Sequence, residues 1–419
     1  MTEENKIVKN FPNSGDLGTP KLRFTEFGIE KWETKRLGEI ATFTKGKGIS
    51  KSDIYENGET ECIRYGELYT FYEEVISEIK SKTNTDISSL VLSEANDVII
   101  PASGETQIDI ATASCVLKSG VALGGDLNVI KTKNNGVFLS YYLNSKKKLE
   151  IAKLSQGVSV VHLYSSQLAL LNLKLPQLEE QNKLANFLSL LNSRIQTQKK
   201  IIEDLIILKS NTAQNIFNQV FKFKDSEGIG FPNWQIKKLG DVCEIKRGAS
   251  PRPISDSKWF DEDSKIGWVR ISDVTKSDKY LEKTEQYLSS AGISKSRLVK
   301  KGNMIMSICA TIGKPIYTNF DVCIHDGFVV FENLTLDKEF LYYYLDFIQL
   351  NWYKYGQPGI QVNLNSEIVN NESVVVPVIE EQIKIAEFLS KFDEKIKLEN
   401  ELLTQYENQK KYLLQNLFV

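Results

Sequence analysis

The sequence predicts a mixed α/β (α+β) protein in which two related globular domains are joined by two long helices that form an antiparallel coiled coil. Three observations support this fold class. Residues 177–222 and 378–419 contain neither Gly nor Pro, and both show apolar residues at helical spacing. These two stretches match each other at an offset of 201 residues. The stretches before them also match, at offsets close to this value, so the chain is a tandem duplication.

The apolar residues of the first long helix fall along one seam, at spacings of three and four. They are Leu188, Leu191, Ile195, Ile202, Leu205 and Ile216. At about 1.5 Å per residue, a helix of this length is roughly 65 Å long. One small domain cannot cover such a seam, so we expect the first helix to lie against the second.

The matches divide the chain into six segments. They are an N-terminal arm or loosely docked extension (1–30), a first domain (31–176), the first long helix (177–222), a linker (223–233), a second domain (234–376) and the second long helix (377–419). If the termini of each domain lie close together, the first helix carries the second domain to its far end. The second helix then packs by running back, which makes the pair antiparallel.

The register of the helix pair follows from its polar seam positions, which are Gln198 and Lys209 in the first helix and Glu399 and Lys410 in the second. We predict that Lys209 faces Glu399 and Gln198 faces Lys410, because unpaired polar groups in a seam cost stability. A slip of one heptad would instead bury Gln198 against Leu403. In a further alternative, both lysines extend to solvent and the domains set the register.

Both domains share a frame of short matched segments. They open with WETKRLGEIATFTKG over 32–46 and WQIKKLGDVCEIKRG over 234–248, which predicts a strand running into a polar loop. Later matches predict a buried strand (96–104 and 303–313), a helix (140–145 and 342–347) and a last strand (NLKLP and SVVVP) before each long helix. The segments between the matches, above all 69–95 and 275–302, hardly resemble each other.

The composition limits the kinds of partner. The net charge of −2, from 52 basic and 54 acidic residues, argues against a protein that coats nucleic acid by bulk charge. No apolar run approaches the length of a membrane span, so we expect no membrane partner. The five cysteines are scattered and odd in number, which favours a reduced, cytoplasmic setting.

No catalytic or cofactor pattern stands out. His162 and His325 have no Cys, His or carboxylate at ligand spacing, which argues against a zinc site. The glycines around Gly46 fail the dinucleotide-binding pattern, and the Gly313–Lys314 pair fails the Walker-A pattern. We therefore expect a chain without catalytic activity of its own.

Loops in both copies carry side chains suited to DNA. Lys and Arg side chains suit phosphates, while Gln and Thr side chains suit base edges. The candidate DNA-binding residues are Lys45, Lys47, Lys51, Arg64, Tyr65, Thr106, Gln107, Lys246, Arg247, Arg252, Lys258, Arg270, Lys314, Gln357 and Gln361. Two interpretations stay open for Arg64 and Arg270: each pairs with an acid nearby in the sequence, Glu67 or Asp273, or points to DNA.

On these residues the chain resembles the specificity (S) subunits of type I restriction–modification systems. The resemblance rests on domains that open with W-x4-LG-x7-G and close with P-x2-EEQ-x5-FL before a long helix, and it covers nearly the whole chain. It implies two target-recognition domains related by a pseudo-twofold axis, each reading one half of a bipartite DNA site. It also implies that the coiled coil sets the spacing and docks two modification (methyltransferase) subunits.

The resemblance further assigns partner binding to the start of each long helix, at Glu179, Glu180, Gln181, Phe187, Glu380, Glu381, Gln382 and Phe388. It implies that S-adenosylmethionine, ATP and Mg belong to the partner subunits, namely the methyltransferase and the restriction (translocase/endonuclease) subunits. The chain has no Gly-rich cofactor loop and no N/D-P-P-Y/F tetrapeptide of adenine methylases. The alternative is a coiled-coil scaffold or adaptor protein that does not bind DNA, and salt-dependent binding of a specific duplex separates the two.

Overall fold

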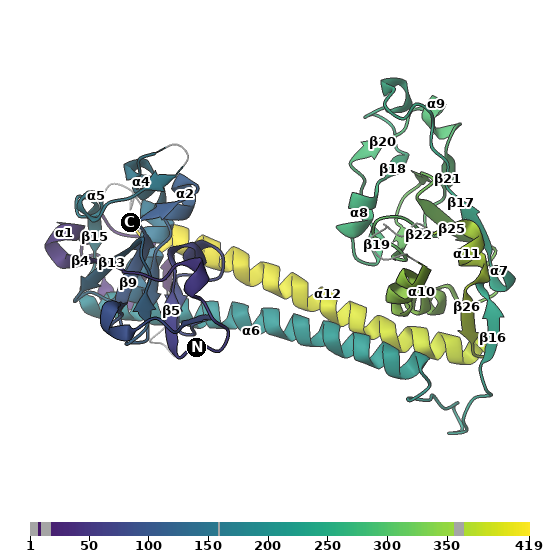
Figure 1. The fold of residues 1–419 in the computed structure, drawn as a ribbon, viewed down its shortest axis with the longest axis horizontal. Coiled ribbons are helices and arrows are strands. Elements are labelled where there is room, and N and C mark those ends of the chain that lie inside the picture. Colours follow the sequence, from purple (N-terminus) through teal and green to yellow (C-terminus); the bar gives the residue numbers. More distant parts are fainter. Residues whose placement is uncertain (1–6, 10–17, 158–159, 356–363) are drawn as a thin grey trace. The chain divides into compact units, whose positions relative to one another are not determined.

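The structure, a computed structural model, describes residues 7–9, 18–157, 160–355 and 364–419. The chain divides into two compact units: unit 1 contains residues up to 199 and from 401 onwards, and unit 2 contains residues 200–400. Each unit combines one globular domain with part of both long helices (Figure 1). We call the globular parts domain 1 (residues 18–176) and domain 2 (residues 234–376).

The described part of domain 1 is built on a five-stranded sheet in the order β4-β13-β9-β11-β6. Its strands are β4 (Ala41–Lys45), β13 (Leu127–Thr132), β9 (Asp97–Pro101), β11 (Ser114–Val116) and β6 (Val75–Ile76). Strand β6 pairs parallel with β11, whereas the other neighbours pair antiparallel. A four-stranded sheet contains β7 (Ser81–Thr83), β5 (Thr60–Ile63), β12 (Ala122–Leu123) and β8 (Val91–Leu92) in that order. The apolar run of β9 is fully buried, as expected for a central strand.

Domain 2 repeats both sheets in the same spatial order among its described residues. The five-stranded sheet contains β17 (Glu244–Arg247), β25 (Phe328–Glu332), β22 (Met304–Ser307), β23 (Pro315–Thr318) and β19 (Tyr280–Leu281). The four-stranded sheet contains β20 (Gln286–Tyr287), β18 (Gly267–Val269), β24 (Val322–Ile324) and β21 (Arg297–Val299). The edge strand β19 pairs parallel with β23, as β6 does with β11.

Smaller elements complete each domain. Two-stranded pairs join β1 (Ile7–Lys9) to β2 (Leu22–Phe24), β3 (Glu33–Arg36) to β15 (Asn172–Leu175), β10 (Ser103–Gly104) to β14 (Val161–His162) and β16 (Gln235–Lys238) to β26 (Ser373–Val376). The short helices are α1 (Leu37–Ile40), α2 (Gln107–Ile110), α3 (Gly136–Tyr142), α4 (Lys148–Leu154), α5 (Ser165–Leu168), α7 (Leu239–Val242), α8 (Ile271–Thr275), α9 (Ser290–Ile293), α10 (Lys338–Phe347) and α11 (Ser366–Asn371).

The predicted fold class is confirmed: two duplicated mixed α/β domains precede two long helices, α6 (Leu178–Phe217) and α12 (Ile379–Asn416). In unit 1 the start of α6 packs antiparallel against the end of α12, because Leu184 and Leu188 share a core with Leu413 and Leu417. In unit 2 the end of α6 packs against the start of α12 in the same sense. Among the described residues, no helix is long and apolar enough to cross a bilayer.

Residues 22–24 of the N-terminal extension are firmly docked, which corrects the expectation of an arm or a loosely docked extension for this part of residues 1–30. Strand β2 belongs to the core of unit 1, where Leu22 and Phe24 are 5% and 2% exposed. Between them, the Arg23 guanidinium binds the Glu180 carboxylate of α6 at 2.7 and 2.8 Å. Residues 22–24 are therefore a structural part of domain 1.

The predicted register of the helix pair is wrong. The Lys209 amine lies 2.6 Å from Asp393, and the Lys410 amine lies 2.9 Å from Asn192. These contacts fall within about one residue of the alternative that is slipped by a heptad, and Gln198 is indeed buried. The physical reason is that both lysines leave the seam sideways and reach polar groups where the domains meet the helices, so the seam itself need not pair them.

Candidate nucleic-acid interface

In domain 1, four loops meet at one end of the five-stranded sheet. Backbone hydrogen bonds connect them: Gly46 N–H donates to Leu127, Lys47 N–H to Leu123, Gly125 N–H to Gly48, Gly124 N–H to Ile63 and Ala102 N–H to Asp126. Gly46 must lack a side chain, because a Cβ there would lie about 2.0 Å from the Gly124 carbonyl oxygen. We call this place loop edge 1, defined by residues 45–49, 63–65, 101–104 and 123–126.

Loop edge 1 brings together several predicted DNA-binding residues. Lys45 ends β4 and Lys47 follows it. Both lysines are exposed, and Lys45 lies 3.6 Å from Asp126 in an exposed ion pair. Such a pair is weak in water, so both amines remain available to phosphates. Arg64 and Tyr65 sit on the adjoining loop, and the exposed Lys51 follows a few residues after Lys47.

Arg64 pairs internally, as one of the two open interpretations has it. Its guanidinium lies 3.1 Å from the buried Glu67 carboxylate, which also accepts the Arg64 backbone N–H and the Ser81 hydroxyl. The acid thus caps the short helix that starts at Tyr65. Arg64 holds this loop in place while part of its side chain stays exposed.

Thr106 and Gln107 lie close after the strand that borders loop edge 1. Thr106 is the N-cap of α2, and its hydroxyl accepts the Asp109 backbone N–H at 3.1 Å. This role accounts for the threonine without DNA. Gln107 is exposed in the first turn of the same helix and keeps its predicted role as a candidate.

Domain 2 contains the same edge, made by equivalent bonds. Gly248 N–H donates to Phe328, Ala249 N–H to Ile324 and Ile308 N–H to Gly327. We call this place loop edge 2, defined by residues 247–250, 269–270, 307–309 and 324–327. A Cβ on Gly248 would lie about 2.1 Å from the His325 carbonyl oxygen, so the requirement for Gly is repeated as well.

The side chains of loop edge 2 differ from those of loop edge 1. Arg247 donates from Nε to the Asp326 carbonyl oxygen at 2.7 Å, and Arg297 donates to the Arg247 carbonyl oxygen. Arg270 is exposed, while its acid, Asp273, accepts the Arg270 backbone N–H instead of the guanidinium. Of the two predicted arginines, Arg270 is therefore the better placed for DNA.

Sequence reasoning missed His325, which lies in loop edge 2, and Arg297, which donates to this edge from β21. His325 Nδ1 accepts the Gly327 N–H at 2.9 Å, and burial lowers the pKa of its imidazole, so it is neutral at pH 7. Gly124 is the equivalent residue in loop edge 1, because Gly124 directly follows β12 and His325 directly follows β24, the matching strand of domain 2. The difference between Gly124 and His325 at equivalent positions of the two copies is the sequence signal that could have identified His325.

Other predicted DNA-binding residues lie elsewhere. Lys246 lies one residue before the end of β17 and forms solvent-accessible ion pairs with Glu244 and Glu332. Lys314 donates to the Ser277 carbonyl oxygen at 2.6 Å, and burial lowers the pKa of its amine. The Lys314 amine therefore has an internal role, which corrects its assignment, whereas the solvent-accessible ion pairs of Lys246 are weak and leave it a candidate, as for Lys45. Lys258 stacks over Trp259 and pairs with Asp256, and Arg252 is exposed, whereas Gln357 and Gln361 lie outside the described residues.

Four of the predicted partner-binding residues are buried inside their own units, so their assignment is also corrected. Glu180 and Gln181 are each 2% exposed, and Glu381 and Gln382 are each 3% exposed. Each Gln holds its domain to its helix, because its side chain accepts the backbone N–H of the residue that caps α3 or α10 and donates to the carbonyl of Pro176 or Pro377.

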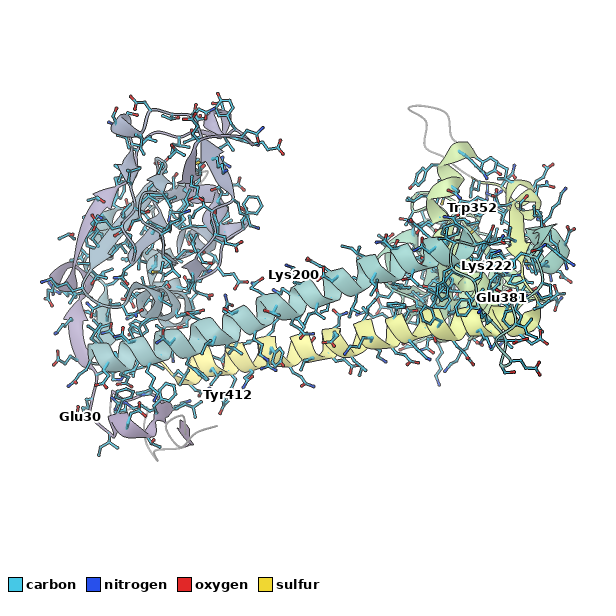
Figure 2. The ribbon with its side chains drawn as sticks, turned by 90° about the horizontal axis from the view of Figure 1, so that it is seen from below. Glu30, Lys200, Lys222, Trp352, Glu381 and Tyr412 are labelled. Atoms are coloured by element: carbon cyan, nitrogen blue, oxygen red, sulfur yellow. The ribbon has the colours of Figure 1, made fainter. Side chains whose placement is uncertain are left out.

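The two acids have different partners. Glu180 binds Arg23, whereas Glu381 accepts the Trp234 indole N–H at 2.9 Å. Burial raises the pKa of Glu381, which lies at the start of α12 beside the segment with Lys222 (Figure 2). Phe187 and Phe388 are half-buried against aromatic neighbours, and Glu179 and Glu380 are exposed, so these four remain candidates for partner contacts.

Among the described residues, no group of three or more His, Cys, Asp or Glu side chains is placed to hold a metal ion. In each domain the same backbone frame holds a loop edge, and the exposed side chains of the two edges differ.

A comparison with family models identifies the family. The model described as the type I restriction modification DNA specificity domain matches residues 29–205 and again residues 232–408. The chain therefore belongs to the family of type I restriction–modification specificity subunits.

Similar proteins agree with this assignment. The chain is 26% identical over 408 residues to the type I restriction enzyme MjaVIII specificity subunit of Methanocaldococcus jannaschii, covering 92% of this chain and 91% of that protein. Its fold resembles the crystal structure of a type I S subunit from M. genitalium, with a TM-score of 0.59, 16% identity and coverage of 96% and 99%. A chain from a study of complex assembly in the type I R–M system gives the same TM-score at 18% identity, with coverage of 92% and 97%.

Proposed function

We propose that this chain is the DNA-recognition subunit of a type I restriction–modification complex and that each domain reads one half of a bipartite site. The observation that carries the proposal is the duplicated loop edge. Equivalent backbone bonds hold both edges, yet one presents the exposed Lys45 and Lys47 and the other presents the exposed Arg247 and Arg270. A shared frame with different exposed side chains suits two readers of different sequences.

In this proposal the helix pair sets the distance between the half-sites and docks two methyltransferase subunits. S-adenosylmethionine, ATP and Mg are bound by the partner subunits, and this chain has no catalytic role. The buried residues at the start of each long helix hold the domains, so docking is left to exposed residues such as Glu179 and Glu380.

Domain exchange tests the proposal. Residues 234–376 are replaced by the equivalent part of a relative with another specificity, and methylated adenines are mapped in a host that supplies the methyltransferase subunit. One half of the methylated motif should change while the other half stays the same. The matched exchange of residues 31–176 should change the opposite half.

Three outcomes would contradict the proposal. A change of both halves by either exchange would exclude the two-reader arrangement. Methyl transfer or cleavage by the purified chain, free of other subunits, would contradict its non-catalytic role. If the complete complex binds no duplex in a salt-dependent, sequence-specific way, the scaffold alternative holds instead.

A further inference from the structure

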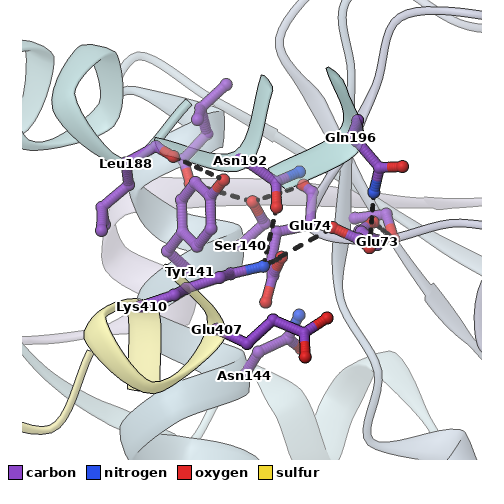
Figure 3. A network of polar contacts seen from close by, with 12 residues as sticks. Glu73, Glu74, Ser140, Tyr141, Asn144, Leu188, Asn192, Gln196, Glu407 and Lys410 are labelled. Carbon is purple, nitrogen blue, oxygen red and sulfur yellow. Dashed lines mark hydrogen bonds and ion pairs between the residues drawn. The ribbon is translucent and has the colours of Figure 1, made fainter. Parts of the chain in front are cut away.

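Domain 1 meets the helix pair through a polar cluster centred on Lys410 of α12 (Figure 3). The Lys410 amine lies 3.0 Å from the Glu74 carboxylate, donates to the Asn192 side-chain carbonyl oxygen at 2.9 Å and lies 5.8 Å from the centre of the Tyr141 ring. The side chain of Lys410 is 17% exposed, so these contacts largely replace water. We call Glu74, Tyr141, Asn192 and Lys410 contact cluster 1.

Domain 2 meets the helix pair through a matching cluster centred on Lys209 of α6. The Lys209 amine lies 2.6 Å from the Asp393 carboxylate and 5.3 Å from the centre of the Tyr343 ring. The Lys279 amine lies 3.6 Å from Asp393 and donates to the Tyr343 hydroxyl at 2.9 Å. We call Lys279, Tyr343, Asp393 and Lys209 contact cluster 2.

The members of the two clusters are equivalent one by one. Lys209 and Lys410, and likewise Asn192 and Asp393, are separated by the 201 residues of the helix repeat. Tyr141 and Tyr343 occupy matching places in α3 and α10, which are equivalent helices of the two domains.

Backbone hydrogen bonds show that Glu74 and Lys279 are equivalent as well. Glu74 precedes β6 and Lys279 precedes β19, and both accept a backbone N–H of the neighbouring strand at 2.9 Å, from Cys115 and from Tyr317. Both residues fall in the segments whose sequences hardly resemble each other.

The charge pattern is exchanged between the clusters. In cluster 1 the domain supplies the acid, Glu74, and its helix supplies the neutral Asn192. In cluster 2 the domain supplies a base, Lys279, which also pairs with Glu339 of α10 at 2.5 Å, and its helix supplies the acid, Asp393. Lys410 has two close carboxylates, since Glu73 of domain 1 also lies 3.5 Å from its amine, whereas Lys209 has the Asp393 carboxylate of its own helix pair. A mixed arrangement would leave Lys410 and Lys279 to share the Glu339 carboxylate, or would place Glu73, Glu74 and Asp393 around Lys209.

We propose that the helix pair carries two domain-docking surfaces with different charge requirements. The surface made by Asn192 and Lys410 accepts a recognition domain with an acid at position 74. The surface made by Asp393 and Lys209 accepts a recognition domain with a base at position 279. Recognition domains are therefore not interchangeable between the two places, although their frames match.

The consequence for DNA specificity rests on the proposed function, whereas the pairing itself does not. A domain that moves between the two places carries its DNA preference with it only if residue 192 or 393 changes as well. Stability measurements test the pairing without DNA, so its failure and the failure of the proposed function are distinguishable.

The first test uses point variants of the full chain and follows thermal unfolding. Glu74→Lys should lower the unfolding temperature, because the introduced amine would face Lys410 beside a neutral amide. Asn192→Asp should lower that temperature in the wild type, where Glu74 and Glu73 already face Lys410, and raise it by roughly 2–4 °C in the Glu74→Lys background. Ser193→Asp adds the same charge at an exposed neighbouring position and should have the same small effect in both backgrounds.

The second test places domain 2 at both positions by replacing residues 31–176 with a copy of residues 234–376. The chimera with Asn192→Asp should unfold at a higher temperature than the chimera with Asn192, and Ser193→Asp should give no such gain. If the chimera does not fold, the point variants decide. The proposal is overturned if Asn192→Asp shifts the unfolding temperature in the same direction in the wild type and in the Glu74→Lys background.

Discussion

Breaking the ion pair between Arg23 and Glu180 tests whether the EEQ motif at the start of α6 has a structural role or binds a partner. Both side chains are almost fully buried, at 5% and 2% exposure, and two guanidinium N–H groups donate to the carboxylate. Glu180→Ala leaves the Arg23 charge buried, because its remaining bonds go to the carbonyls of Gly28 and Glu30. Removing one partner of such a pair costs about 3–5 kcal/mol. For a unit of this size that corresponds to roughly 6–20 °C in unfolding temperature.

Two control variants sharpen the expectation. Glu381→Ala removes the equivalent acid, whose partner is the neutral indole of Trp234, and should cost no more than about 1–3 kcal/mol for an unsatisfied N–H. The double variant Arg23→Met, Glu180→Leu removes both buried charges and should recover much of the loss, since apolar pairs of similar volume often replace buried ion pairs at little cost.

The assay combines denaturant unfolding with hydrogen exchange. Exchange in peptides covering residues 18–30 reports on unit 1 alone and should accelerate in Glu180→Ala but not in Glu381→Ala. The reasoning is refuted if Glu180→Ala unfolds within about 1 kcal/mol of the wild type and keeps its exchange pattern. Loss of methyltransferase binding in such a stable variant would restore the predicted partner contact.

Three further outcomes are expected. Replacing Lys45, Lys47 and Lys51 with Ala should weaken duplex binding and lower the slope of log affinity against log salt by nearly one unit per lost phosphate contact. The control triple at Lys31, Lys35 and Lys133, away from loop edge 1, should have neither effect. An unchanged slope in the first variant would exclude its three lysines from the interface. Arg64→Ala should lower the unfolding temperature by roughly 2–4 °C through loss of the Glu67 pair, while Arg270→Ala should keep stability and weaken DNA binding; the reverse pattern would contradict the assignment. Burial raises the pKa of Glu381 above its usual 4.5, so folding takes up a proton there and stability falls as pH rises from 4.5 to the raised pKa; denaturation of Glu381→Gln over that range should lack this fall, and parallel pH profiles would disprove it.

The sequence predicted the duplicated frame because few other residue types can replace the residues that form it. Gly46 and Gly248 are required by carbonyl oxygens that a Cβ would meet at about 2.0 and 2.1 Å, so both copies keep them. The buried strand β9 and the long helices follow from apolar spacing alone. The fold class, the buried strands and the presence of the long helices were therefore accessible without the structure, whereas α6 ends at Phe217, before the predicted end at residue 222.

The register of the helices and the candidate sites were less accessible. Matching polar seam positions in pairs assumed that lysines stay in the seam, whereas Lys209 and Lys410 reach polar groups beside it. Glu74 and Lys279 lie in segments without sequence similarity, so their equivalence emerges only from shared backbone bonds. The EEQ motif looked like a partner surface because a repeated polar motif at a helix start gives no information about burial.

The same motif explains how the two copies could diverge while their fold stayed the same. Gln181 and Gln382 keep identical backbone partners, so neither copy tolerates a change there without loosening its domain. Glu180 and Glu381 bind side chains, and here the copies differ: Arg23 takes the acid in unit 1, and Trp32 is buried with no hydrogen-bond partner for its indole N–H among the described residues. In unit 2 the equivalent Trp234 takes the acid itself. Hydrogen bonds to the backbone therefore hold the frame in both copies, whereas bonds between side chains can be exchanged. Because the frame does not depend on the exchanged side chains, loop edges 1 and 2 can acquire different exposed residues on one fold.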